Sequence, residues 1–182
     1  MRADDISLEY FTLADAGRLI SWFSSSRLLF QFDPNLTYPL TKQQLEARFI
    51  DYNRRGAPHF AFRVVQAELG PIGHIELFPT DYHNKFGVIS HVLIGDEKLR
   101  GQGYGTKALE LICKFGFHEL RLHRLELLVM AFNTPAISCY EKVGFRKEGM
   151  FREKRIFDGE YQSTYLMGLL DREYFELNPL TS

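Results

Sequence analysis

The chain has 182 residues, of which 45% are apolar and 25% are charged, a size at which one compact domain can bury a full core without disulfides or metal. The 22 basic and 23 acidic residues leave a formal net charge of −1, which gives no reason to expect nucleic acid as a partner. The two cysteines, Cys113 and Cys139, exclude a disulfide framework and lack the spacing of a zinc site, so we expect no metal and a reducing, cytoplasmic location.

The first third of the chain is predicted to form one strand and two helices. Apolar and polar residues alternate over residues 6–12, which predicts a strand, and residues 15–23 have the pattern of a short amphipathic helix. Two prolines mark residues 33–40 as a loop. A capping-box pattern then predicts a helix over residues 41–56 that ends at Gly56.

Three strands follow in succession. They are predicted at residues 60–66, 72–78 and 86–94, with a turn at Gly70-Pro71 and a polar loop between them. Strands joined by such short connections favour an antiparallel meander.

The second half of the chain alternates helices and strands. Apolar residues at helical spacing after Gly105 predict an amphipathic central helix. A strand at residues 124–130 precedes a second helix, which is predicted to begin with Thr134 as its N-cap and to end at Gly144.

The last segment is predicted to be a hairpin. Its strands, at residues 145–156 and 161–169, are joined by the turn dipeptide Asp158-Gly159. The full order, β-α-α-β-β-β-α-β-α-β-β, predicts an α/β (α+β) fold with a mixed, mostly antiparallel central sheet and helices on both faces. We expect residues 1–182 to form a single domain.

A glycine-dense turn joins the strand that ends at Ile94 to the central helix. Glycines let the backbone approach a ligand, and unpaired N–H groups at a helix start favour a phosphate group. The turn lacks the lysine of a Walker A loop and the spacing of a dinucleotide-binding motif, which disfavours a nucleotide-binding regulator. Some other phosphate-bearing ligand is therefore predicted.

Two motifs in this half resemble the signatures of the GNAT acetyltransferase superfamily. The first is the segment Arg-Gly-Gln-Gly-Tyr-Gly at residues 100–105, which fills the pattern Arg/Gln-x-x-Gly-x-Gly/Ala. The second runs from Asn133 through Ala136 and Tyr140 to Gly144-Phe145, as in Asn-x-x-Ala-x-x-x-Tyr-x-x-x-Gly-Phe. The C-terminal hairpin is similar to that of the branch with the ribosomal-protein N-terminal acetyltransferases and the spermidine acetyltransferases.

The resemblance implies a site for acetyl-CoA. The pyrophosphate of coenzyme A would be held by the turn, with the residues Arg100, Gly101, Gln102, Gly103, Tyr104, Gly105 and Thr106. The strand before the turn would splay from its neighbour and leave backbone groups free for the pantetheine arm, at Val92, Leu93 and Ile94. Asn133 would orient the donor or an ordered water.

Acetyl transfer to an amine by direct attack in a ternary complex needs a proton for the leaving thiolate and a base for the amine. Tyr140, with an ordinary pKa of about 10, stays protonated at neutral pH and is our candidate general acid. The base is left open between His74, Glu76, His91 and water, because His74 and Glu76 share a strand face and His91 lies on the next strand.

The acceptor is not identified by the sequence. A primary amine of a protein N-terminus, a polyamine or a small metabolite fits the resemblance, and the alternative is a non-catalytic acyl-CoA-binding or sensing module. A homodimer or higher homo-oligomer stays open, because the aromatic segment at residues 28–32 fits either an interface or a wall of the substrate pocket. No apolar run reaches the ~20 residues of a membrane span, and we expect no signal peptide and no membrane association.

Overall fold

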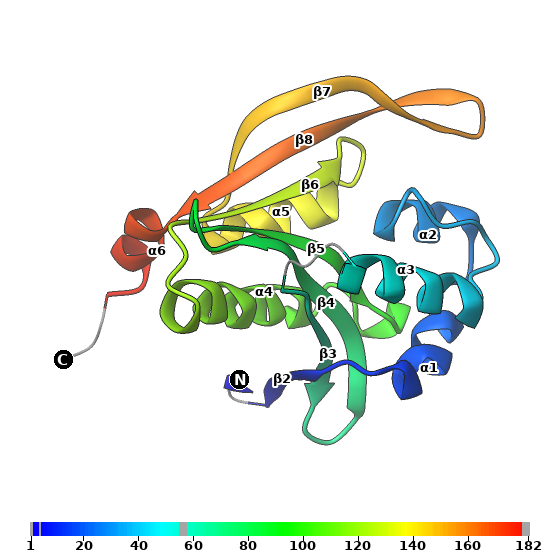
Figure 1. The fold of residues 1–182 in the computed structure, drawn as a ribbon, viewed down its shortest axis with the longest axis horizontal. Helices are drawn as coiled ribbons and strands as arrows, with labels where there is room; N and C mark the ends of the chain where they lie inside the picture. Colours follow the sequence, from blue (N-terminus) through cyan, green and yellow to red (C-terminus); the bar gives the residue numbers. More distant parts are fainter. Residues whose placement is uncertain (1, 4, 55–57, 180–182) are drawn as a thin grey trace.

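The computed structural model describes residues 2–3, 5–54 and 58–179. Within these residues the strands form one sheet in the order β1-β2-β3-β4-β5-β6-β8-β7 (Figure 1). The strands are β1 Arg2–Ala3, β2 Ile6–Tyr10, β3 Phe60–Gln66, β4 Gly70–Asp81, β5 Phe86–Ile94, β6 Arg124–Met130, β7 Arg146–Phe157 and β8 Glu160–Leu170. Neighbouring strands are antiparallel except for β5 and β6, which are parallel.

The α-helices are α1 Ala16–Ser21, α2 Ser26–Phe32, α3 Lys42–Arg54, α4 Tyr104–Lys114, α5 Thr134–Val143 and α6 Asp171–Leu177. Short 3-10 turns lie at Leu13–Asp15 and Glu97–Leu99, and a π turn at Phe115–Glu119 extends α4. Among the helices of the described residues, none combines the length and the apolar character that crossing a membrane requires.

The predicted fold class is confirmed, a mixed and mostly antiparallel sheet with helices on both faces. The structure adds elements that the patterns did not predict, which are the short strand β1 and the helices α2 and α6. The N-cap of α5 is Asn133 and not Thr134, because the Asn133 side chain accepts a hydrogen bond from the amide of Ala136 (3.4 Å). The predicted end of α3 at Gly56 lies outside the described residues.

The two faces of the sheet carry separate apolar cores. One core packs α4 and α5 against the strands, and its buried stripe on α4 consists of Ala108, Leu109, Leu111 and Ile112. The other packs α1, α2 and α3 around Leu19, Leu29 and Leu45. β4 is buried on both faces, since Ile75 and Leu77 belong to the first core while His74 and Glu76 alternate with them.

The sheet opens between its two parallel strands. Pairing of β5 with β6 covers only Phe86–Val88 against Arg124–Glu126, although both strands continue for several residues. This is the splay that the resemblance implied. It leaves a gap in the sheet whose sides are the second halves of β5 and β6.

The hairpin of β7 and β8 extends beyond the rest of the sheet and bends toward α2 (Figure 1). Asp158 and Gly159 form its turn with positive φ angles of 49° and 78°, as the Asp-Gly dipeptide predicted. Near this turn, the ring of Phe157 packs on Phe30 of α2 with centroids 4.7 Å apart. The hairpin and α2 therefore meet across the open side of the sheet.

Candidate active site

A cavity of about 680 Å³ lies where β5 and β6 separate. Its walls come from α2, β5, the start of α4, the end of β6, α5 and the hairpin. This volume is typical of a small-molecule site. The helix α2, residues 33–35 and the hairpin end line one part of it, which we call the acceptor end after the role proposed for it below.

The turn between β5 and α4 presents unpaired amides to this cavity. Gly101 and Gly103 adopt left-handed φ angles of 76° and 89°, which glycine tolerates, and the space beside both Cα atoms is open. In the described residues, no backbone carbonyl accepts from the amides of residues 101–106, and the first helical hydrogen bond joins Lys107 N–H to Gly103 C=O (3.0 Å). Such a turn fits a pyrophosphate, because successive N–H donors meet the positive end of the α4 dipole.

The side chains of the turn have different roles. Arg100 donates from Nε to the Ile94 carbonyl (2.8 Å) and from Nη2 to the Gly95 carbonyl (2.9 Å), so it fastens the end of β5 to the turn. The Ile94 carbonyl thus already accepts one hydrogen bond, while Ile94 lines the cavity together with Val92 and Leu93, and their contact with the pantetheine arm stays a prediction. Gln102 donates from Nε2 to the Lys98 carbonyl (2.6 Å). Gln102 and Tyr104 do not line the cavity, whereas the other residues from Arg100 to Thr106 do.

Tyr140 lies on the cavity wall beside Ala136, one helical turn before it on α5. Ala136, whose side chain is a single methyl group, lines the same cavity. Tyr140 is 8% exposed, and burial raises the pKa of its hydroxyl above its ordinary value. The group stays protonated at neutral pH, as a proton donor must.

Three further residues of the motifs lie at the same wall. Asn133 lines the cavity while its side chain caps α5. The Thr106 hydroxyl lies 3.2 Å from the Cys139 thiol, so this contact links α4 to α5. Burial raises the pKa of the Cys139 thiol, which disfavours a thiolate nucleophile there.

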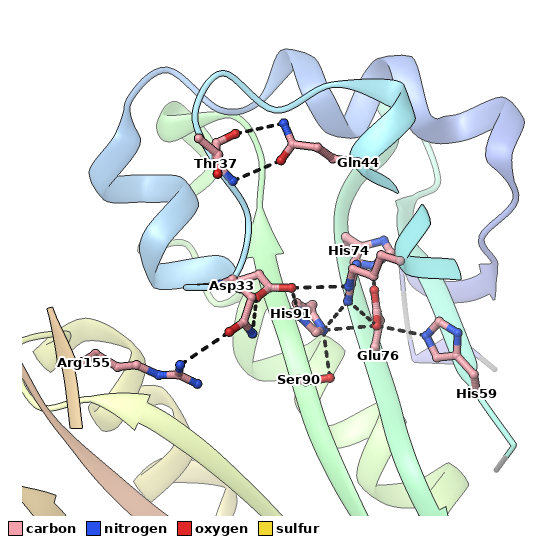
Figure 2. A network of polar contacts seen from close by, with 11 residues as sticks. Asp33, Thr37, Gln44, His59, His74, Glu76, Ser90, His91 and Arg155 are labelled. Carbon is pink, nitrogen blue, oxygen red and sulfur yellow. Dashed lines mark hydrogen bonds and ion pairs between the residues drawn. The ribbon is translucent and has the colours of Figure 1, made fainter. Parts of the chain in front are cut away.

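A buried polar cluster adjoins the acceptor end (Figure 2). Its centre is Glu76, whose side chain is fully buried. The Glu76 carboxylate contacts Arg48 Nη2 (2.7 Å) and His91 Nδ1 (3.1 Å). It also contacts His59 Nε2 (2.9 Å) and His74 Nε2 (2.7 Å). The charges of His91 and Arg48 outweigh the burial that would raise the pKa of Glu76, and they hold it well below its usual range.

A β-bulge turns His91 toward this cluster. The register of β4 with β5 shifts here, because His74 pairs with Leu93 and Glu76 with Ser90, so the single residue Ile75 opposes two residues, His91 and Val92. His91 takes a positive φ of 54°, uncommon for a residue with a side chain, and its Nδ1 lies 2.9 Å from Ser90 Oγ. In a regular strand the adjacent side chains of Ser90 and His91 would point to opposite faces of the sheet, so it is the bulge that brings them together.

The cluster reaches the cavity through Asp33 and His91. Both line the cavity, whereas His74 and Glu76 are sealed behind them. His91 Nε2 lies 3.1 Å from Asp33 Oδ2. Asp33, at the C-cap of α2, had not been singled out from the sequence, because only the packing of α2 on β5 places it here.

Electrostatics distinguish the histidines. Burial lowers the pKa of His74, which is neutral at physiological pH. Burial acts in the same direction on His91, but the charge of Glu76 and the hydrogen bond to Asp33 outweigh it and raise the pKa of His91 above its ordinary 6.5. Of these two histidines, His91 is therefore the more basic, and it is the one that lines the cavity.

The family assignment follows from a match of residues 5–146 to the model of the acetyltransferase (GNAT) domain. The chain belongs to this family. Among curated relatives, it is 34% identical to the uncharacterized N-acetyltransferase YokL from the SPbeta prophage of Bacillus subtilis, over 65% of this chain and 66% of that protein.

Spermidine acetyltransferases are also similar. The spermidine N(1)-acetyltransferase of Escherichia coli K12 is 29% identical over 61% of this chain and 59% of its own length. The crystal structure of spermidine N-acetyltransferase from Vibrio cholerae with CoA and spermine superposes with a TM-score of 0.80, at 24% identity, over 94% of this chain and 98% of that one. The chain thus spans less than two thirds of these curated relatives, and the structural match shows the fold.

Proposed function

We propose that this protein transfers an acetyl group from acetyl-CoA to a primary amine, by direct attack within a ternary complex. The observation that carries the proposal is that one cavity is lined both by Tyr140, with its protonated phenol, and by four residues of the turn whose amides donate to no backbone carbonyl of the described residues, Gly101, Gly103, Gly105 and Thr106. When bound, acetyl-CoA supplies an activated acyl group.

The amides of the turn bind phosphate oxygens, and Tyr140 donates its proton to the departing sulfur. The pair of Asp33 and His91 accepts the proton of the amine. Neutral His91 leaves two carboxylates, Asp33 and Glu76, facing one guanidinium of Arg48, so the cluster gains a balanced charge when it takes up a proton. Of the sequence candidates for the base, we propose His91, with Glu76 and His74 positioned behind it.

Tyr140→Phe tests the proposal. We expect turnover to fall by about 10- to 1,000-fold, because the phenol no longer protonates the thiolate, while acetyl-CoA affinity is retained. Release of free thiol measures turnover, and calorimetry measures donor affinity. Tyr161→Phe, at a tyrosine that is 64% exposed on the hairpin, is the matched control and keeps the full rate. Full activity of Tyr140→Phe would show that another group protonates the sulfur.

The competing function is a non-catalytic acyl-CoA-binding module. Tight binding of coenzyme A without turnover on any amine of a broad panel would establish it. We further propose a single acetyltransferase domain over residues 1–182 and a cytoplasmic location, with the oligomeric state to be measured by light scattering. At residues 28–32, α2 provides a cavity wall through Leu28 and Phe32, which supports the pocket reading of this segment.

A further inference from the structure

The acceptor end of the cavity is rich in positive charge. Arg27 of α2 and Lys154 and Arg155 of the hairpin line it. The only carboxylate among the described residues that line the cavity is Asp33. A polyamine, which carries several positive charges, would meet an end of its own sign.

Within the part of the chain that the structure describes, these three cations have no acidic partner. Among the described residues, no carboxylate lies within ion-pair distance of Arg27, Lys154 or Arg155. Arg27 stacks over the ring of Phe132 at 4.6 Å, and Lys154 lies 3.9 Å from the ring centroid of Phe151. By contrast, Arg124 on β6 pairs with two glutamates. The charges at the acceptor end are therefore available to a ligand.

Arg155 lies close to the base. Its Nη1 is 3.4 Å from the Asn35 side-chain oxygen, and Asn35 donates from Nδ2 to Asp33 Oδ1 (3.0 Å). Figure 2 shows Arg155 extending from the hairpin toward Asp33 and His91. A ligand whose amine approaches Asp33 can place a second group beside the Arg155 guanidinium.

Asp33 cannot balance these cations. Its Oδ2 already contacts His91 Nε2 (3.1 Å) and Arg48 Nε (3.4 Å), while its Oδ1 accepts from the Asn35 backbone and side chain. A fully engaged carboxylate attracts an added cation weakly, whereas an unpaired guanidinium binds carboxylate or phosphate oxygens strongly.

We propose that the acceptor is a small primary amine that also carries a carboxylate or phosphate group, which Arg155 binds with help from Arg27 and Lys154. This inference rests on the proposed function and names its substrate class. Polyamines, the substrates named for the spermidine acetyltransferases above, would be repelled by the same charges, so we expect them to be poorer acceptors.

Paired acceptors that differ only in the anion test the proposal. With acetyl-CoA as donor, we expect kcat/KM to be about 10- to 100-fold higher for a free L-amino acid than for its carboxamide, or for O-phosphoethanolamine than for ethanolamine. This is the scale of one charge-assisted hydrogen bond. The two pairs distinguish a carboxylate from a phosphate. Spermidine is expected to be poorer than the preferred anionic amine.

Arg155→Gln tests the residue. We expect the KM of the anionic acceptor to rise about 10- to 100-fold while kcat and the KM of acetyl-CoA stay near their original values. Arg152→Gln is the matched control, since Arg152 lies on the same strand outside the cavity lining. A rise in the KM of acetyl-CoA instead would assign Arg155 to the donor phosphates and overturn the proposal.

The outcomes separate this inference from the proposed function. Turnover of spermidine or of neutral amines in preference to anionic ones overturns the inference and leaves the acetyltransferase intact. If no amine is acetylated, the proposed function fails, and calorimetry of the same amines with the CoA complex decides the inference. The inference is supported if only the amines with an anionic group bind and Arg155→Gln loses this binding. It is overturned if the anionic amines and their neutral counterparts bind equally, or if neither binds.

Discussion

Glu76 is a buried carboxylate surrounded by three histidines and an arginine. Glu76→Gln keeps the shape of the side chain but removes one of the two buried carboxylates that face Arg48 and His91, and leaves Asp33 to balance both. We therefore expect a loss of about 3–5 kcal/mol in the free energy of unfolding. Urea denaturation at pH 7 measures it. Glu141→Gln, which removes an exposed pair with Lys147, is the control and costs less than about 1 kcal/mol. A loss at position 76 no larger than in this control would contradict the description of the cluster.

The depressed pKa of Glu76 also has a direction in pH. A carboxyl group whose pKa is lowered by folding stabilises the protein above its unfolded pKa, near 4.5 here. That contribution is lost as pH falls through the lower, folded pKa. The cluster therefore contributes less to stability in acid. The difference in free energy of unfolding between Glu76→Gln and the original protein becomes smaller as pH falls.

The pH dependence of the activity is expected to follow His91, whose pKa is raised above 6.5. Since only neutral His91 accepts a proton, kcat/KM rises with pH through a pKa above 6.5 and levels off beyond it. Initial rates from pH 6 to 9 measure this limb, and His91→Gln abolishes it. A profile that is flat over this interval, or one that His91→Gln leaves unchanged, excludes His91 as the base.

At the scale of elements, the donor turn depends on its left-handed glycines. Gly103 has a φ of 89° and open space beside it, so in Gly103→Ala the cost is backbone strain of about 1–2 kcal/mol and no clash. We expect a lower melting temperature and weaker coenzyme A binding, measured by calorimetry. Gly17→Ala, in α1 with an ordinary φ and equally open space, is the control and leaves binding unchanged. Equal donor affinity in both variants would show that the turn does not hold the donor.

Elements that local patterns encode were predictable. The strand bounds of β3, β5 and β6 match the alternation of their residues, and the Asp-Gly turn of the hairpin matches its dipeptide. The helix α2 was missed because its apolar residues occupy barely two turns, too short a window for a helical period to stand out from a loop.

The site was predictable only in part, for a physical reason. The proposed donor half is one continuous segment from β5 into α4, together with α5, so sequence motifs could indicate it. The half that we propose to accept the proton is assembled from residues far apart in sequence, which are Asp33, Arg48, Glu76 and His91. A β-bulge turns His91 toward Glu76. The position of this bulge depends on tertiary packing, and period-two alternation does not encode it.

At the scale of the whole molecule, the sheet is joined at β5 and β6 by three residue pairs only. We expect coenzyme A to slow amide exchange beyond this junction, at residues 89–94 of β5 and 127–130 of β6, because its pantetheine arm offers amide groups to both edges. Hydrogen exchange with mass spectrometry measures this, and the far strands β2 and β3 are the internal control. Exchange slowed equally in all strands would point to global tightening instead.

The opening between β5 and β6 also bears on how the two halves of the protein communicate. One half carries the aromatic helices and the titrating histidine, and the other carries α5 and the long hairpin. We expect a cosubstrate bound between the two halves to hold them at a fixed separation, and thus to make the sheet more rigid only while it is bound. Arrival of the donor is thus expected to set the width of the acceptor chamber, which favours an order of binding in which coenzyme enters first.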